Sequence, residues 1–565
     1  MALVLLVSTG GLIARLFQLQ VIEHGRYARE AYEEHYAERP TYATRGPILD
    51  RSGQPLAMSV EAWDIYVNRL VWESETQAAA ESSSVLAPIT GEEPSALVAR
   101  VLNQANGELL VAEAIDYSVG LNVREQELTG VRFEPSSRRV YPEGDLASAL
   151  IGFIGRDRIG LAGLEERYNE TLQGTPGVTI YEQDSMGNQI AVGQLSVLEP
   201  EPGGSVVLTI DRGVQRAAER ALDEAIAHYE AKGGSIIVMD PWTGEILALT
   251  SRPSIQLSAL DFSSEEIVDL SRVRAVTDLY EPGSPFKLIT MAAALDAGAV
   301  TPDTTYEDAG SYTWSDFTIR NWDGSANGIQ TMTQVLEKSL NTGAIWAART
   351  TGSQVFYDYL ARFGFDQASG IDISGEAVGS YRLPDNPAWS PLDLATNSFG
   401  QGINVTPLQL INAVSAIANG GNLMQPYIIK EVHGPDGVVR TQPEVVHRAV
   451  SEWTSRTLRN MMTQVVDGIS GQAGIPGYSI AGKTGTTSIF SSALGEYDLQ
   501  RVIVSFTGIV PADDPRFVVL VKIDEPAGQA WGSTVAAPVF QRLAIEIVSL
   551  LNVPPDTAVV QRNEE

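Results

Sequence analysis

The distribution of apolar and polar positions first sets apart the N-terminus. The first thirteen residues, MALVLLVSTGGLI, carry no charge, and the apolar pattern resumes after Arg15 with LFQLQVI. A membrane-spanning helix needs about 20 apolar residues, so this run suffices if Arg15 lies at the lipid–water boundary. No basic segment precedes the run and no small-residue cleavage site stands out, which argues against a cleaved signal peptide. We expect residues 1–22 to be a membrane anchor that begins partly upstream of Met1; a buried soluble helix is the other alternative.

Residues 23–205 mix short helical and strand patterns and contain no cluster of catalytic residue types. Residues 23–44 are polar and rich in Glu, Arg and Tyr, which predicts a helix or stalk that leaves the bilayer. RGPILDRSGQPLA, residues 45–57, is typical of two strands joined by a turn at residues 50–53. EPEPGGS at 199–205 is rich in turn residues and marks a boundary. We interpret residues 23–205 as a non-catalytic pedestal or dimerisation-type module of mixed α/β structure.

The pattern changes after residue 205. SVVLTIDRGVQRAAERALDEAIAHY predicts a strand and an amphipathic helix, and GGSIIVMDPWTGEILALTS predicts a hairpin. Helices are predicted at about 285–297, 333–350 and 406–419, the last with Thr406 as its N-cap. Three further strands, YSIAGKTGT, RVIVSFTGIV and RFVVLVKIDEP, precede a closing helix over 537–551. The order predicts an α+β domain over residues 206–555, an antiparallel sheet flanked by helices, with a tail at 556–565.

Composition narrows the classes of function. Asp and Glu number 70 against 39 Lys and Arg, which gives a formal net charge of −31. Such a surface repels phosphate backbones, so we expect no nucleic-acid partner. The chain has no cysteine, which excludes disulfides and a cysteine nucleophile and suits a protein outside the cytoplasm. The histidines lie outside every motif and give little support to a Ser-His-Asp triad or a metal site: His24, His35, His228, His433 and His447.

The candidate chemistry lies in EPGSPFKLITMAAALDAG, residues 281–298. Pro285 favours the first helical position, which places Ser284 at the N-cap, where free N–H groups can stabilise negative charge. Lys287 lies on the same face and is the only charge from Phe286 to Leu295. Burial would lower the pKa of its amine, and a neutral lysine beside a serine is a general base beside a nucleophile. In most isolated S-x-x-K sequences the lysine is an ordinary surface residue, so this motif alone does not establish a catalytic site.

Two further motifs change the interpretation. KSLNTG contains Ser339-Leu340-Asn341, and AGKTGTT contains Lys483-Thr484-Gly485-Thr486. In this order, S-x-x-K, S-x-N and K-T-G are the motif set of penicillin-recognising serine acyl transferases. The chain resembles a class B penicillin-binding protein nearly end to end, on RGPILDRSGQPLA, RRVYPEG, GLAGLEERY, DPWTGEILAL, EPGSPFK, FGQGINVTPLQL and GYSIAGKTGTT. The segment FTGIVPADDPRFVVLVKIDEP favours the division, or septal, branch. One departure is SRPSIQLSAL, which lacks the Asn of the PSxxPN stretch that commonly follows the hairpin.

The resemblance implies a monofunctional peptidoglycan D,D-transpeptidase that works through a serine acyl-enzyme, without a cofactor or a metal. It implies a five-stranded sheet and gives each motif residue a role. Ser284 would be the nucleophile and Lys287 its base, Ser339 would relay a proton to the leaving group, and Asn341 would hold Lys287 and the substrate amide. The residues expected to bind the terminal carboxylate are Lys483, Thr484, Gly485 and Thr486. The backbone N–H groups of Ser284 and Thr486 would form the oxyanion hole.

The resemblance also implies partners and a location. Peptidoglycan stem peptides and lipid-linked precursor strands would be substrates, and β-lactams would acylate the same serine. We expect a single-pass protein of the bacterial cytoplasmic membrane, its catalytic domain outside, working with a membrane glycan polymerase and other divisome proteins. No transglycosylase segment is apparent, which argues against the bifunctional class A type. The alternatives are an elongation-type transpeptidase, a β-lactam-sensing or β-lactam-hydrolysing protein, and a non-catalytic divisome scaffold. The long N-terminal module argues against the second and the intact motifs against the third.

Overall fold

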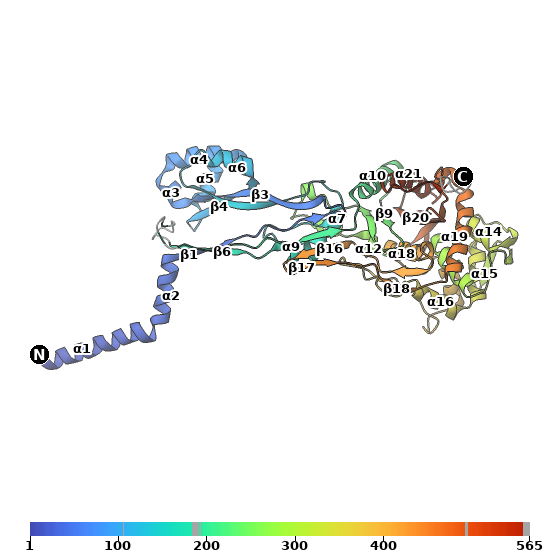
Figure 1. Ribbon diagram of the computed structural model, residues 1–565, viewed down its shortest axis with the longest axis horizontal. Helices are drawn as coiled ribbons and strands as arrows, with labels where there is room; N and C mark the ends of the chain where they lie inside the picture. Colours follow the sequence, from blue (N-terminus) through green and yellow to red (C-terminus); the bar gives the residue numbers. More distant parts are fainter. Residues whose placement is uncertain (106, 183–189, 191–192, 194, 492–494, 557–565) are drawn as a thin grey trace, which may run out of the picture. The chain divides into compact units, whose positions relative to one another are not determined.

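The computed structural model spans residues 1–565 and describes all of them except 106, 183–189, 191–192, 194, 492–494 and 557–565 (Figure 1). The chain divides into two compact units and crosses between them more than once. The first unit contains residues 1–46, 58–140 and 170–204. The second contains residues 47–57, 141–169 and 205–565 and carries all three sequence motifs.

The first unit begins with the predicted apolar helix. α1 (Ala2–Phe17) continues as a π-helical turn, Gln18–Ile22, and together they make a helix of 21 residues that is long and apolar enough to cross a membrane. None of its most apolar stretch is buried in protein, whereas a core helix of a soluble protein would be mostly buried. α2 (His24–His35) follows and leads into β1 (Tyr36–Thr41). β1 pairs with β6 (Gly177–Glu182), which pairs in turn with β7 (Leu195–Leu198).

The rest of the first unit is a small α/β layer. From Met58 onward β3 (Pro55–Asn68) pairs with β5 (Val131–Val140) on one side, and from Ala62 with β4 (Glu108–Asp116) on the other. The helices of this layer are α3 (Arg69–Ser74), α4 (Thr76–Thr90), α5 (Pro94–Leu102) and α6 (Tyr117–Arg124). Trp72, Leu86 and Leu97 from these helices are buried together with Ile65 of β3, and this apolar contact holds the layer together.

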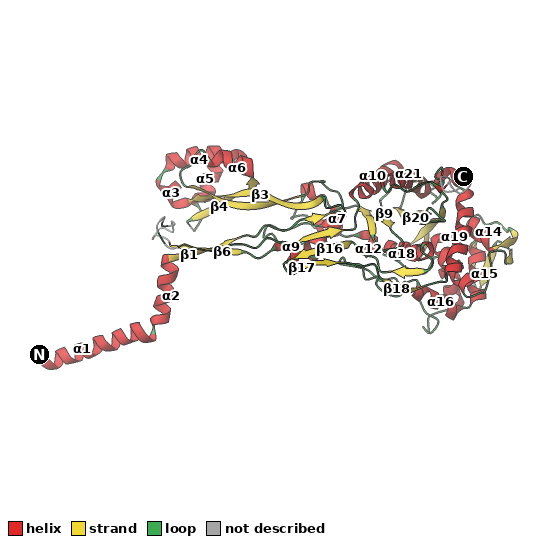
Figure 2. Ribbon diagram, viewed as in Figure 1, coloured by secondary structure: helices red, strands yellow, loops and turns green. Residues whose placement is uncertain are grey.

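The second unit is built around the predicted five-stranded antiparallel sheet, in the order β10-β9-β21-β20-β19. Figure 2 labels two of its strands, β9 and β20. The strands are β9 (Gly233–Met239), β10 (Ile246–Arg252), β19 (Ala481–Ser491), β20 (Glu496–Val510) and β21 (Phe517–Asp524). β9 and β10 form the predicted hairpin, and a short turn joins β20 to β21. β19, which carries the K-T-G motif, is an edge strand, so one side of its backbone is not paired within this sheet.

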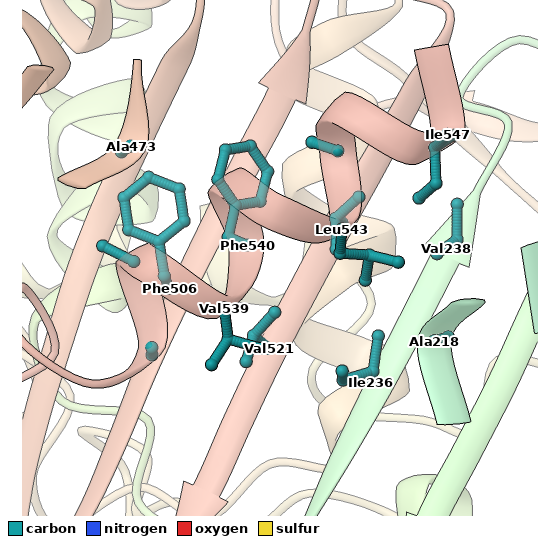
Figure 3. Packing of buried hydrophobic residues seen from close by; sticks show 14 of the residues in the cluster. Ala218, Ile236, Val238, Ala473, Phe506, Val521, Val539, Phe540, Leu543 and Ile547 are labelled. Carbon is teal, nitrogen blue, oxygen red and sulfur yellow. The ribbon is translucent and has the colours of Figure 1, made fainter. Parts of the chain in front are cut away.

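Side chains along a strand alternate between the two faces of a sheet, and in β9 and β21 the side chains on both faces are buried. Helices therefore cover both faces. α10 (Arg212–Tyr229) and α21 (Ala536–Leu550) lie on the face toward which Ile236 points, and Figure 3 shows Phe540 and Leu543 of α21 directed at that side. The rings of Phe540 and Phe506 lie 4.6 Å apart. Complete burial of one such side chain stabilises a fold by about 1.5–3 kcal/mol. Met239 points to the other face, where its sulfur accepts a hydrogen bond from Ser415 of α18 (Pro407–Ala418).

Other helices and small sheets complete the second unit. Its remaining helices of four or more residues, over the part of the chain that the structure describes, are α7 (Ser148–Ile151), α8 (Gly163–Arg167), α11 (Ile267–Leu270), α12 (Arg274–Thr277), α13 (Lys287–Asp296), α14 (Met332–Glu337), α15 (Asn341–Thr351), α16 (Ser353–Arg362), α17 (Pro391–Asn397), α19 (Glu452–Asp467) and α20 (Ser470–Ala473). α9 (Asn169–Gln173) begins at the last residue of this unit's 141–169 segment, and its other residues belong to the first unit. The strands outside the main sheet are β2 (Ile48–Leu49), β8 (Ser205–Leu208), β11 (Thr305–Asp308), β12 (Ser311–Trp314), β13 (Phe317–Arg320), β14 (Gly328–Thr331), β15 (Asn422–Met424), β16 (Ile429–Gly434), β17 (Gly437–Arg440) and β18 (Val445–Arg448). β11 pairs with β14 and β12 with β13, and both pairs precede the S-x-N motif in the chain.

The closing helix predicted at 537–551 is α21, and the three helices predicted between residues 285 and 419 agree with the structure to different degrees. The helix predicted at about 406–419 is α18, capped by Thr406 as expected. The helix predicted at about 285–297 begins as a 3-10 turn over Ser284–Phe286 before α13. The single helix predicted at about 333–350 is two helices, α14 and α15, because the backbone of Ser339 between them is left-handed, with φ of +56°. A right-handed helix cannot pass through a residue in that conformation.

Candidate active site

Ser284 lies in a tight turn at the start of α13. The residue before it, Gly283, has φ of +64° and is the cap of this turn, so the prediction that Ser284 itself is the N-cap is wrong by one residue. Gly283 allows the sharp entry because it has no side chain, and a Cβ here would overlap Thr487 of β19. Its N–H donates to the carbonyl of Gly400 at 3.0 Å. The turn is thus held between strand β19 and the loop at Gly400, and Ser284 is half-buried.

The Lys287 side chain is buried, as predicted, with 1% of its surface exposed. Its Nζ donates to the Ser339 carbonyl at 2.6 Å and lies 3.2 Å from the Ser339 hydroxyl. Burial lowers the pKa of Lys287 well below its usual value, and the nearby charge of Lys483 lowers it further. The lowered pKa favours the uncharged form of this amine, which is the form that a general base requires.

Ser339 connects the three motifs. Its hydroxyl oxygen lies 3.0 Å from Ser284 Oγ and 3.0 Å from Lys483 Nζ, in addition to its contact with Lys287. The left-handed backbone turns both its carbonyl and its hydroxyl toward Lys287. The sequence predicts a direct pairing of Lys287 with Ser284. Over the part of the chain that the structure describes, no hydrogen bond joins these two side chains, and Ser339 lies between them.

Asn341 is the first residue of α15, and its Nδ2 donates to the carbonyl of Arg320 at 2.9 Å. Among the described residues no hydrogen bond joins Asn341 to Lys287, and the role expected for Asn341 toward the lysine and the substrate amide stays a prediction. The Lys287 amine is instead held by the carbonyl of Ser339.

The K-T-G residues lie on edge strand β19. Lys483 is fully buried, and burial lowers its pKa to about 7. Its Nζ also lies 3.3 Å from the Thr484 carbonyl. The Thr486 hydroxyl accepts a hydrogen bond from the Gly532 N–H at 3.0 Å. Gly485 packs so closely that a Cβ there would lie 2.8 Å from Pro285 Cδ, which explains the glycine.

The donors and acceptors of this cluster permit a proton relay. A neutral Lys287 keeps one N–H on the Ser339 carbonyl and has its lone pair free to accept from the Ser339 hydroxyl. Ser339 can then accept a proton from Ser284 while it gives its own to Lys287. Lys483 donates to the same hydroxyl and supplies positive charge beside it. The arrangement can therefore activate Ser284 as a nucleophile.

Two exposed tryptophans beside the motifs are not singled out by the sequence patterns. Trp322 is 60% exposed and Trp531 42% exposed, yet their ring centroids lie 5.5 Å apart. Trp322 Nε1 donates to the Lys338 carbonyl at 3.2 Å, directly before Ser339. Trp531 precedes Gly532, whose N–H binds Thr486. The only local signal was an aromatic residue within a turn-rich segment, NWDG or AWGS, and such a signal does not reveal the contact.

Comparison with known families agrees with this fold and site. Residues 234–544 match the Penicillin binding protein transpeptidase domain, and residues 40–208 match the Penicillin-binding Protein dimerisation domain. The first match alone covers more than half of the chain. The chain belongs to the class B penicillin-binding proteins, as its motifs indicate.

Named relatives and solved structures cover nearly the whole chain. It is 34% identical over 524 residues to Stage V sporulation protein D of Bacillus subtilis, with 91% of this chain and 80% of that protein covered. It is 31% identical over 557 residues to peptidoglycan D,D-transpeptidase FtsI of Escherichia coli K12, with 98% and 91% covered. The crystal structure of penicillin binding protein 3 from Mycobacterium tuberculosis, complexed with aztreonam, has a TM-score of 0.70 at 28% identity, with 92% and 98% covered. A peptidoglycan synthetase from Bifidobacterium adolescentis has a TM-score of 0.73 at 28% identity, with the same coverage of each chain.

Proposed function

We propose that this protein is a peptidoglycan D,D-transpeptidase that cross-links stem peptides through an acyl-enzyme on Ser284, and that β-lactams acylate the same residue. The observation that carries the proposal is the hydroxyl of Ser339, held between Ser284 and two buried lysines. The name of the FtsI relative and the aztreonam complex of the structural relative support the same activity.

In the proposed acylation, Ser284 Oγ attacks the carbonyl carbon between the last two D-alanines of a donor peptide. Its proton passes to Lys287 by way of Ser339, as the contacts at 3.0 and 3.2 Å allow. The N–H groups of Ser284 and Thr486 would stabilise the oxyanion. Among the described residues no protein group accepts a hydrogen bond from the Ser284 N–H, which leaves it free for substrate. The C–N bond then breaks, and the terminal D-alanine leaves with a proton returned through Ser339.

The proposed second half-reaction transfers the acyl group to an amine. An amino group of a neighbouring stem peptide attacks the ester on Ser284 and loses a proton to the Lys287–Ser339 pair, and Ser284 is regenerated. One amide bond replaces another, so the reaction needs no nucleotide energy source. During acylation, before the terminal D-alanine leaves, the cationic form of Lys483, with the hydroxyls of Thr484 and Thr486 and the close approach allowed by Gly485, would bind the terminal carboxylate of the donor.

The location and partners belong to the same proposal. Residues 1–22 would anchor the protein in the bacterial cytoplasmic membrane, residues 23–205 would form the pedestal, and residues 206–555 would be the catalytic domain outside the membrane. The exposed apolar helix and the two family matches support this division. A septal role beside a membrane glycan polymerase and other divisome proteins, with lipid-linked precursor strands as the source of peptides, fits the resemblance to the division branch.

The decisive experiment is labelling with a fluorescent penicillin, followed by mass mapping of the modified peptide. We expect one label, on Ser284, and none in Ser284→Ala. Ser549→Ala, which removes a hydroxyl from the exposed end of α21, is the matched control and should label as the wild type does. A label on another residue, or retention of cross-linking by Ser284→Ala, would contradict the proposal. Rapid turnover of the acyl-enzyme by water would identify a β-lactam-hydrolysing protein instead.

A further inference from the structure

Asp308, at the end of β11, is a buried carboxylate outside every motif. It is 1% exposed, and over the described residues it forms no salt bridge. Its oxygens accept hydrogen bonds from Asn321 Nδ2 at 2.9 and 3.1 Å, from Asn327 Nδ2 at 2.7 Å and from Thr342 Oγ1 at 2.7 Å. The backbone N–H groups of Asn327 and Gly310 each donate at 3.0 Å. One carboxylate thus binds three separate segments of chain.

Two of those segments lie on either side of the S-x-N motif. Thr342 directly follows Asn341 in the first turn of α15, and its N–H also donates to Asn321 Oδ1 at 3.3 Å. Asn341 itself donates to the carbonyl of Arg320. On the other side of the motif, Trp322 binds the carbonyl of Lys338. The 320–327 segment, which Asp308 holds, therefore contacts the chain immediately before and immediately after Ser339.

The buried charge of Asp308 is stable only if its hydrogen-bond donors stay in place, so the segments that carry these donors must be held rigidly. Burying an ion without a counter-ion is costly unless hydrogen bonds satisfy it completely. Burial by itself raises the pKa of Asp308, but hydrogen bonds from Asn327 and Thr342 overcome this effect and hold the pKa below its usual value. Nearby, Ser339 adopts a left-handed conformation, which is strained for a non-glycine residue and persists only when its surroundings enforce it. The network around Asp308 supplies such surroundings.

We propose that Asp308 is a positioning residue for the acyl transfer: by tying the 320–327 segment to the first turn of α15, it sets Ser339 and Asn341 relative to Ser284. This inference rests on the proposed function. Asp308 touches neither nucleophile nor base, and it acts through the S-x-N loop.

Asp308→Asn tests the inference because it keeps the shape but replaces one acceptor oxygen with an NH₂ group that faces the donors of Asn321 and Asn327. We expect the second-order rate constant of penicillin acylation to fall about 10- to 100-fold, because small misplacement of reacting groups is costly. The label should remain on Ser284. Asp372→Asn is the matched control. Asp372 accepts hydrogen bonds from two backbone N–H groups, each at 2.8 Å, and neither donor belongs to a motif. Asp372→Asn should lower the rate less than twofold.

A double-mutant cycle separates positioning from general loss of structure. If Asp308 acts through Asn341, Asp308→Asn should cost much less in an Asn341→Ala background than in the wild type. Thr342→Val removes one partner of Asp308 by a nearly isosteric change, and it provides the same test if Asp308→Asn does not fold. Thr342→Val should lower the acylation rate by a smaller factor than Asp308→Asn does. Its effect should likewise be smaller in the Asn341→Ala background than in the wild type.

The outcomes distinguish the inference from the function on which it rests. Wild-type protein that is not labelled at Ser284 would overturn the proposed function. Wild-type labelling with unchanged rates in both Asp308→Asn and Thr342→Val would overturn the positioning role alone. Additive effects with Asn341→Ala, or an equal loss in Asp372→Asn, would also overturn it, because either result would mean that the loss does not pass through the S-x-N loop.

Discussion

At the scale of single residues, the chemistry depends on how many protons one hydroxyl can exchange. A serine hydroxyl has one proton to donate and two lone pairs. If both lysines donate to Ser339, its proton must point to Ser284, and Ser284 cannot be deprotonated through it. Once Lys287 is neutral, the Ser339 hydroxyl can donate to Lys287 and accept from Ser284, so Ser284 can lose its proton. The protonation state of Lys287 is therefore the switch between an idle and a reactive Ser284.

The pH dependence of acylation should reveal this switch. As the pH falls through the lowered pKa of Lys287, the amine gains a proton and the rate should decrease. As the pH rises through the pKa of Lys483, about 7 in the free protein, the charge that binds the substrate carboxylate is lost and the rate should also decrease. We expect a bell-shaped profile of the acylation rate constant. A rate that rises steadily toward the ordinary lysine pKa of about 10.4 would contradict it.

The hydroxyl of Ser339 can be tested apart from its backbone. Ser339→Ala and Ser339→Gly both remove the hydroxyl, but only glycine adopts φ of +56° without strain. We expect both variants to acylate roughly 10²- to 10⁴-fold more slowly, as the loss of a proton-transfer group predicts. Stopped-flow measurements with a chromogenic β-lactam give the rates, and thermal unfolding gives the strain. Near-normal acylation by Ser339→Gly would mean that the backbone, and not the relay, is what the reaction uses.

At the scale of elements, the site is formed where the turn before α13 meets edge strand β19. The motif glycines allow this contact: Gly283 lies against Thr487, and Gly485 lies against Pro285. The break between α14 and α15 then brings Ser339 to the same point. The first motif thus lies at an irregular helix start, the second lies at a break between two helices, and the third lies on a strand with one unpaired edge.

Gly485→Ala should separate β19 from the Ser284 turn. The added Cβ would lie 2.8 Å from the rigid ring of Pro285, so one of the two elements must shift, at a cost of about 1–3 kcal/mol. We expect slower acylation together with a lower melting temperature. Gly471→Ala in α20 is the control, because its Cβ would meet no atom within 4 Å. Equal acylation rates in the two variants would show that the close approach at Gly485 is not needed.

At the scale of the whole molecule, each of the two units has a core of its own, and Ala2–Ile22 form an apolar helix at the start of the first. The formal charge of −31 gives the protein no electrostatic attraction to anionic lipid. The proposed membrane attachment would therefore depend on the apolar helix.

Removal of residues 1–22 should convert the protein from a membrane-bound to a water-soluble form. We expect the full chain to float with phosphatidylcholine vesicles and the shortened chain to remain in the aqueous fraction, with equal rates of penicillin acylation. Adding anionic lipid should not recover binding of the shortened chain. If the shortened chain still floated with the vesicles, attachment would have to involve another surface.

Local patterns along the chain were enough to predict most helices and strands of the second unit and the motif residues of the candidate site. Strand and helix periodicity predicted an antiparallel sheet flanked by helices, the family resemblance implied its five strands, and the three motifs predicted Ser284, Lys287, Ser339 and Lys483, because these signals are local. The break at Ser339, the placement of Asn341 against Arg320 and the network around Asp308 were decided only by the tertiary structure. Their physical cause is the satisfaction of buried polar groups by partners distant in the chain, and no pattern within one segment records which partner that will be.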